Sequence, residues 1–154
     1  MSTSLRRLIL ALLAATGAFV GGWAYFAPRS WYDTFPGFGR HWLPVLGPFN
    51  EHLVKDVGAM YLALAALSAV AAWRAENVLA VQLAGLAWLV FSIPHLIYHL
   101  QHLNMYGGVD KALNVASLSL FVLAGAALLV PGGVASGRLT RACCRRGRRS
   151  RTER

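Results

Sequence analysis

The sequence is poor in charged residues and almost lacks cysteine. Charged residues make up 14% of its 154 residues, whereas soluble domains carry about 25%. Its two cysteines, Cys143 and Cys144, are adjacent, so they indicate neither a disulfide framework nor the spaced pairs of a zinc site. The sequence also contains no P-loop, dinucleotide-binding glycine motif, nucleophile elbow or c-type haem motif. The common sequence signatures of nucleotide-binding and hydrolytic enzymes are therefore absent.

Long apolar segments dominate the sequence instead. Hydrophobic residues make up 56% of the chain and the mean hydropathy is +0.49. Four runs reach the length of about 20 residues that a helix needs to cross a hydrocarbon core of about 30 Å; they cover residues 8–26, 53–73, 78–100 and 112–130. A helix satisfies its backbone groups internally where water is absent. The sequence therefore predicts an all-α integral membrane protein, a four-helix bundle within residues 1–131.

The first of these runs follows Arg6 and Arg7, as the apolar region of a signal peptide would. A cleaved apolar region has about 7–15 residues, however, and this run is longer. It also ends in Trp23, Tyr25 and Phe26, which are typical of a membrane interface. We therefore expect the first run to be retained as a helix.

Lysine and arginine are distributed unevenly between the two ends of the predicted bundle. If both termini lie on one side, that side holds eleven of these residues and the opposite side holds four. Lysine and arginine accumulate on the cytoplasmic side of membrane proteins. We therefore expect cytoplasmic N- and C-termini, in a multi-pass protein of the cell membrane, the plasma membrane of a bacterium.

Residues 132–154 form an arginine-rich tail that holds seven of the nine net positive charges. A block of like charge does not fold alone, so we expect a disordered cytoplasmic tail. Beside the membrane it would bind anionic lipids of the inner leaflet. The remainder of the chain is nearly neutral, which argues against a folded nucleic-acid-binding surface.

The predicted connections differ in length and composition. Residues 74–77 are short enough to force an antiparallel hairpin between the second and third helices. Residues 27–50 form a long outer loop with six aromatic residues and four prolines, so it cannot be one continuous helix. We expect it to lie along the outer interface and to cap the bundle. Gly17 and Gly21 form a GxxxG motif that indicates close helix packing, within one chain or between chains.

Two polar stretches mark the outer ends of the second and third predicted helices. His52 and Asp56 are four residues apart in one stretch, and His95, His99 and His102 follow a helical row in the other. The two helices are consecutive and antiparallel, so the stretches lie at the same predicted depth. Ionisable residues at such positions are costly and indicate function.

Imidazoles and carboxylates together suit zinc, copper or iron. The pattern therefore predicts a candidate metal or haem site on the outer face. Its candidate ligands are His52, Asp56, His95 and His99, with His102 and Glu51 as further candidates.

Other interpretations of these polar residues stay open. They also fit a wet interface, with Lys55 neutralising nearby carboxylates. Asn114 is either a hydrogen-bonding neighbour of the cluster or a helix contact. The small-residue faces fit a homo-oligomer or an accessory subunit of a larger membrane complex, and small-solute or proton transport is a further alternative. The sequence assigns no catalytic residue.

The stretch from Asn50 to Gly58, together with Pro94, His95 and the histidines that follow, carries a resemblance. Across residues 17–131 the chain resembles small four-span membrane proteins of actinobacterial type for which no activity is assigned. The resemblance implies a common architecture and polar motif, but no reaction.

Overall fold

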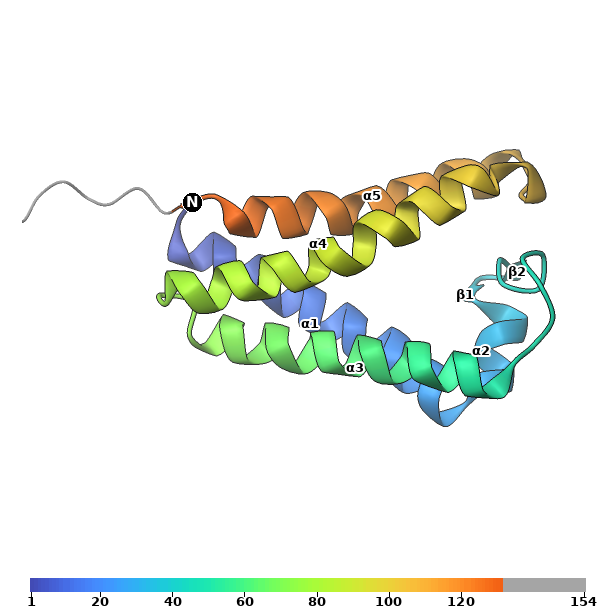
Figure 1. Ribbon diagram of the computed structural model, residues 1–154, viewed down its shortest axis with the longest axis horizontal. Helices are drawn as coiled ribbons and strands as arrows, with labels where there is room; N and C mark the ends of the chain where they lie inside the picture. Colours follow the sequence, from blue (N-terminus) through green and yellow to red (C-terminus); the bar gives the residue numbers. More distant parts are fainter. Residues whose placement is uncertain (132–154) are drawn as a thin grey trace, which may run out of the picture.

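Four long helices dominate the computed structural model, which describes residues 1–131 (Figure 1). Each is long and apolar enough to cross a membrane. They are α1 (Thr3–Phe26), α3 (Glu51–Trp73), α4 (Val78–Gln101) and α5 (Gly108–Leu129). The four predicted runs are therefore confirmed as helices. The predicted disordered tail at 132–154 lies outside the described residues.

Polar residues set where three of these helices begin. The side chains of Ser2, Asn50 and Asn77 each accept a hydrogen bond from a backbone N–H in the first turn of α1, α3 and α4. Those N–H groups have no partner within the helix, so such a cap fixes the start. Helix α5 begins after Gly107 and carries Asp110 in its first turn, where a carboxylate suits the positive end of the helix dipole.

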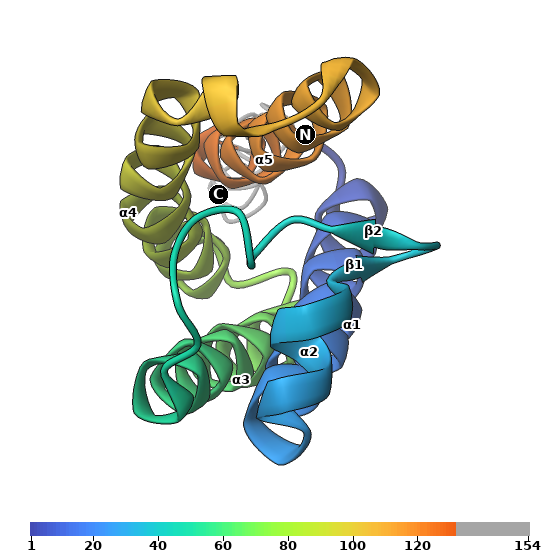
Figure 2. The same cartoon turned by 90° about the vertical axis from the view of Figure 1, so that its right-hand side faces the viewer.

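The long helices pack as two pairs. Helix α1 packs most extensively on α3, and α4 packs on α5 (Figure 2). Helices α3 and α4 contact each other much less, although only residues 74–77 connect them. We call the end with this connection and the N-terminus the turn end, and the end with residues 27–50 and 102–107 the loop end. The antiparallel connection is as predicted, but α4 diverges from α3 towards the loop end (Figure 1).

Glycines bring the backbones together within each pair. A Cβ atom added to Gly21 in α1 would lie 2.8 Å from the Gly58 carbonyl oxygen in α3, and one added to Gly85 in α4 would lie 2.8 Å from the Gly125 carbonyl oxygen in α5. Lipid tails give apolar helices no hydrophobic reason to associate, so close van der Waals packing provides the association. The GxxxG motif that includes Gly21 therefore joins helices of the same chain.

Two arginine side chains link the helices at the turn end. Arg6 is buried, and its Nη2 atom donates to the Val130 carbonyl at 3.3 Å, while Arg7 Nε donates to the Ala72 carbonyl at 3.2 Å. The last carbonyl groups of a helix lack partners within it, and cations suit that negative end. The start of α1 is thereby tied to the ends of α5 and α3.

A buried contact near the middle of the bundle links the two pairs. Trp88 of α4 donates from Nε1 to Ser68 Oγ of α3 at 2.8 Å, and Ser68 donates to the Leu64 carbonyl. The Trp88 ring also stacks on Phe121 of α5, with 5.3 Å between ring centroids.

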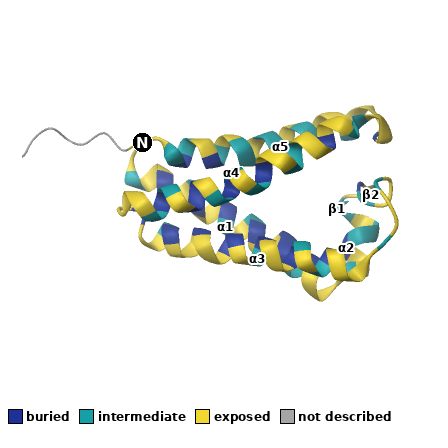
Figure 3. Ribbon diagram, viewed as in Figure 1, coloured by how far each residue is buried: buried dark blue, intermediate teal, exposed yellow. Residues whose placement is uncertain are grey.

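The outward faces of the helices are exposed (Figure 3) and carry many large hydrophobic side chains. Such a surface suits a hydrocarbon surrounding.

The loop at 27–50 contains short elements, as the prolines predict. These are α2 (Pro28–Thr34) and the antiparallel strands β1 (Pro36–Gly37) and β2 (Arg40–His41); a 3-10 turn, η1 (Leu103–Met105), follows α4. Trp31 and Trp42 of this loop are buried, whereas Phe38 at the strand turn is fully exposed. The loop therefore contributes side chains to the interior of the loop end.

Replacing Gly21 with alanine should destabilise the protein, because the new methyl group would collide with the backbone of α3 at Gly58 and Leu62. We expect a clearly lower thermal unfolding midpoint in detergent micelles. Gly22→Ala is the matched control: no atom lies within 4 Å of a Cβ atom at that position, and alanine is favoured over glycine in a helix by about 1 kcal/mol. Equal midpoints for the two variants would contradict the packing argument.

Candidate functional site

The predicted ligands on α3 lie on its exposed face. His52 and Asp56 have side chains that are 84% and 63% exposed, and His52 Nδ1 lies 2.9 Å from Asp56 Oδ2. Glu51 forms a similar pair, with its Oε1 atom 2.7 Å from Lys55 Nζ. These four side chains satisfy one another along the surface of α3. The predicted salt-bridge alternative therefore describes this stretch better than a ligand set does.

Helix geometry explains this placement. Residues two apart in an α-helix point about 200° away from each other. Val54 and Gly58 are buried in the packed side of α3, and His52 and Asp56 each precede one of them by two residues. The glycine contact with α1 therefore turns His52 and Asp56 outwards.

The three histidines of α4 separate in a similar way. The rings of His95 and His99 lie 4.7 Å apart on the inner side, and His99 is only 6% exposed. His102 comes after the last residue of α4, where its Nδ1 atom lies 2.7 Å from the Tyr98 carbonyl oxygen and its ring stacks on Tyr98. The common face is thus confirmed for His95 and His99, whereas His102 belongs to the end of the helix.

These positions leave the predicted metal site without enough ligands. Within residues 1–131, no group of three or more His, Cys, Asp or Glu side chains is arranged to hold a metal ion. His95 and His99 remain as two neighbouring imidazoles, because His52 and Asp56 face outwards. The structure therefore does not support the prediction of a metal site.

His95 and His99 instead line a cavity of about 240 Å³ at the loop end, between the two helix pairs. All four long helices contribute to its walls, and residues of the 27–50 loop cover it. Its lining is mainly apolar and aromatic with a few polar side chains, the usual composition of a small-molecule site, and includes Trp31, Phe35, Trp42, Val57, Tyr61, Asn114, Ser117 and Phe121. No Asp, Glu, Lys or Arg belongs to this lining.

Two polar atoms of this lining are buried without a partner. Asn114 is 1% exposed, and its Oδ1 atom accepts no hydrogen bond from the described residues. The indole Nε1 of Trp31 has no acceptor among them either. An unpaired buried polar group costs about 1–3 kcal/mol, so such groups need an explanation. Both residues belong to the cavity lining, so one unpaired acceptor and one unpaired donor lie in its wall.

Tyr106 orients His99 at the edge of the cavity. Its hydroxyl group lies 3.2 Å from His99 Nδ1, and the two rings stack. Burial raises the pKa of Tyr106 to about 12, so the phenol keeps its proton at neutral pH. If the phenol donates to Nδ1, the ring hydrogen of His99 is on Nε2 and is a further donor; if Nδ1–H donates to the phenol oxygen, Nε2 is an acceptor.

Asp110 attaches the 27–50 loop to the start of α5. Its Oδ1 atom accepts a hydrogen bond from Trp42 Nε1 at 2.9 Å and pairs with the Arg40 guanidinium. Trp42 also packs edge-on against Tyr106. The Asp110 carboxylate thus fixes the position of the 27–50 loop and of the Trp42 ring, which lines the cavity.

A wider hollow of about 550 Å³ adjoins the cavity and opens on the surface between α3 and α4. It shares Trp31, Leu43, Val57, His95 and His99 with the cavity. It continues past Asn50 and Leu53 on α3 and Tyr98 on α4, which are exposed. The divergence of α3 and α4 therefore gives the cavity a side opening at the loop end.

Removal of the Asp110 charge should loosen the loop. In Asp110→Asn we expect faster deuterium uptake by residues 36–43 and a lower unfolding free energy, because the bonds from Trp42 and Arg40 lose their charged acceptor. Asp33→Asn is the control, because Asp33 forms an exposed pair with Arg29 on α2, and exposed pairs contribute about 0–1 kcal/mol. Unchanged uptake in Asp110→Asn would show that the carboxylate does not hold the loop.

The cavity lining includes residues that the sequence singled out and residues that it did not. Sequence reasoning identified His95 and His99 but left Asn114 open and did not single out Trp31 or Tyr106. Asn114 could be found from the sequence because it is the one amide side chain in the apolar run 112–130. The direction of the Trp31 side chain could not, because it depends on the path of the loop.

Comparison with protein-family models, curated proteins and solved structures finds no match to this chain.

Proposed function

We propose that this protein binds a small, uncharged organic molecule in the cavity at the loop end. The supporting observation is the pair of unpaired buried atoms, Asn114 Oδ1 and Trp31 Nε1, in the wall of one cavity. A ligand with a donor and an acceptor would satisfy both, and the His99 imidazole adds a third polar contact. The aromatic lining favours a flat ring, because rings stack or meet edge to face.

The lining also restricts the charge of the ligand. Among residues 1–131, no Asp, Glu, Lys or Arg side chain borders the cavity or the side opening, and an ion without a partner is costly to bury in an apolar site. Anionic and cationic substrates are therefore disfavoured. The pairs His52–Asp56 and Glu51–Lys55 lie on the exposed face of α3 and do not border the cavity.

The proposal includes a membrane setting. The four long helices would cross the bilayer with both termini in the cytoplasm, as the distribution of lysine and arginine predicts. The loop end would then face outwards, and the side opening between α3 and α4 would meet the outer leaflet. A ligand that dissolves in lipid could enter the cavity without crossing water.

Binding is better supported than transport. Below the cavity, the interior between the helix pairs is filled by Leu64, Val81, Ala84 and Trp88, all buried, and the polar groups of Trp88 and Ser68 are satisfied by each other. At the turn end, Arg6 and Gln82 are bound to backbone carbonyls. The described residues therefore contain polar groups for a site at one end but no continuous polar path.

Asn114→Leu tests the proposal by its opposite effects on stability and binding. Leucine removes an unsatisfied buried acceptor, so the ligand-free variant should be as stable as the wild type or more so. Binding of 1-naphthol, whose hydroxyl group can donate to Asn114 Oδ1, followed by quenching of tryptophan fluorescence in micelles, should weaken about tenfold, the effect of one lost hydrogen bond of about 1.4 kcal/mol.

Two further variants complete this experiment. Trp31→Phe keeps an aromatic ring but removes the indole N–H, and should also weaken binding. His52→Leu changes an exposed side chain outside the cavity and should leave binding unchanged. The proposal fails if neither 1,4-naphthoquinone nor 1-naphthol binds the wild type saturably, or if all variants bind alike.

A further inference from the structure

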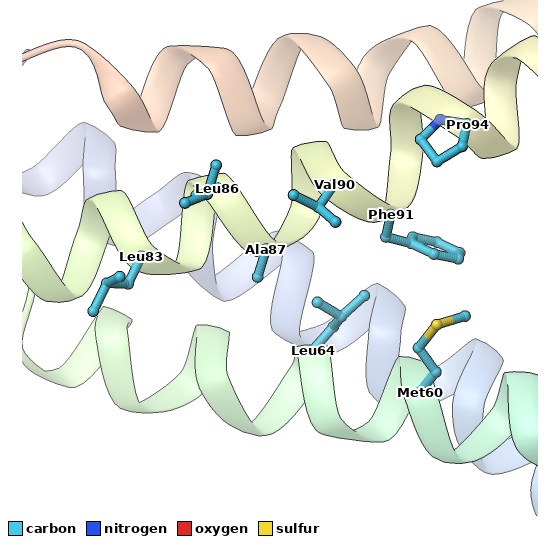
Figure 4. Close-up of a pocket in the computed structure, with 8 residues that line it drawn as sticks. All are labelled: Met60, Leu64, Leu83, Leu86, Ala87, Val90, Phe91 and Pro94. Carbon is cyan, nitrogen blue, oxygen red and sulfur yellow. The ribbon is translucent and has the colours of Figure 1, made fainter.

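An apolar groove runs along the same two helices that border the side opening. It has a volume of about 560 Å³ and lies between α3 and α4 (Figure 4). Its lining consists only of apolar side chains, namely Met60, Leu64, Leu83, Leu86, Ala87, Val90, Phe91 and Pro94. Several of these are about half exposed or more, including Val90 at 67%, so the groove opens on the surface that we propose faces lipid.

The groove follows the side opening along the same two helices. On α3, Val57 borders the side opening and Met60 and Leu64 line the groove; on α4, Tyr98 borders the side opening and Pro94 lines the groove. Residues three and four apart lie on the same side of a helix. Tyr61 of the cavity packs against Phe91 of the groove, with 5.0 Å between ring centroids, so these rings stand between the two and the side opening adjoins both. Figure 4 shows Phe91 and Met60 facing each other across the groove, near Pro94. The cavity, the side opening and the groove therefore form a row, which we call the track, polar at the loop end and apolar towards the turn end.

The length of the groove matches one lipid tail. Leu83 and Pro94 are eleven residues apart on α4, which at about 1.5 Å per residue gives roughly 17 Å. The hydrocarbon core of a bilayer is about 30 Å thick, so the groove covers about the depth of one leaflet. The groove lies at the middle of α4 (Val78–Gln101), so a molecule with its head in the cavity would have its tail running from the outer leaflet past the bilayer midplane.

We infer that the ligand is a lipid with one apolar tail and an uncharged ring as its head, of the isoprenoid quinone type, whose quinone form accepts hydrogen bonds and whose quinol form also donates to an acceptor such as Asn114 Oδ1. The inference rests on the proposed function, because the ring would occupy the cavity, near Asn114 and Trp31. The tail would lie in the groove between α3 and α4. Charged phospholipids fit this track less well, because neither part of it contains a charged side chain.

A bulky side chain introduced into the groove would distinguish binding of the tail from binding of the ring. The full-length protein in nanodiscs is titrated with 1,4-naphthoquinone, which has no tail, and with a menaquinone, which carries a naphthoquinone ring on an isoprenoid tail. In Ala87→Trp the indole would fill the groove, so binding of the tailed compound should weaken about tenfold while binding of the tail-less ring stays within twofold of wild type. Val90→Trp, at a more exposed position of the same lining, should act likewise if Ala87→Trp does not fold.

Ala66→Trp is the matched control, since Ala66 is exposed on α3 and does not line the groove; it should bind both compounds as the wild type does. Unchanged menaquinone binding in both groove variants would overturn the inference while leaving the proposed function in place. If neither compound binds the wild type, both fail. If the groove variants weaken binding of both compounds equally, the effect is not specific to the tail and the inference is overturned.

Discussion

Close backbone contact at glycines determines how this chain folds. Gly21 meets Gly58 between α1 and α3, and Gly85 meets Gly125 between α4 and α5. In a hydrocarbon surrounding, burying leucine or valine against another helix gains little over contact with lipid, so the closest backbone approach selects the partner. Helices α3 and α4, although joined by a short turn, have no such glycine contact among the described residues; side chains such as Trp88 and Ser68 link them, and they diverge towards the loop end. The space between the pairs follows from this choice of partners.

That space is filled in the middle of the bundle and at the turn end. Trp88 donates to Ser68 across α4 and α3, and Arg6 binds the carbonyl that ends α5. At the loop end, the 27–50 loop covers the gap and places Trp31 and Trp42 inside it. Folding thus leaves Asn114 and Trp31 with unpaired polar atoms in a largely apolar cavity. Retaining such groups costs stability, and a bound ligand that pairs with them would offset that cost.

The sequence predicts the number of long helices and most of their ends, because hydropathy is a local signal, but α1 and α5 begin five and four residues before the predicted apolar runs. It also places His95 and His99 on one face. It fails for His52 and Asp56, since their side of α3 depends on which face Gly58 presents to α1, and the sequence alone does not say which helices pair. The positions of Trp31 and Tyr106 could not be predicted either, because both depend on the path of a loop. Asn114 was singled out by the sequence, but its role was left open between a hydrogen bond to the cluster and a helix contact.

The fixed and movable parts of the structure indicate how a ligand would reach the cavity. The glycine contacts hold each pair closed along its length, and Asp110 fastens the loop through Arg40 and Trp42. Neither needs to change for access, because the hollow between α3 and α4 already leads from the surface to His95 and His99. Asp110 therefore keeps the 27–50 loop in place over the cavity, while the divergence of α3 from α4 would provide the entrance. A molecule that enters between helices meets apolar surface first and polar groups last, the order that suits a ligand dissolved in lipid.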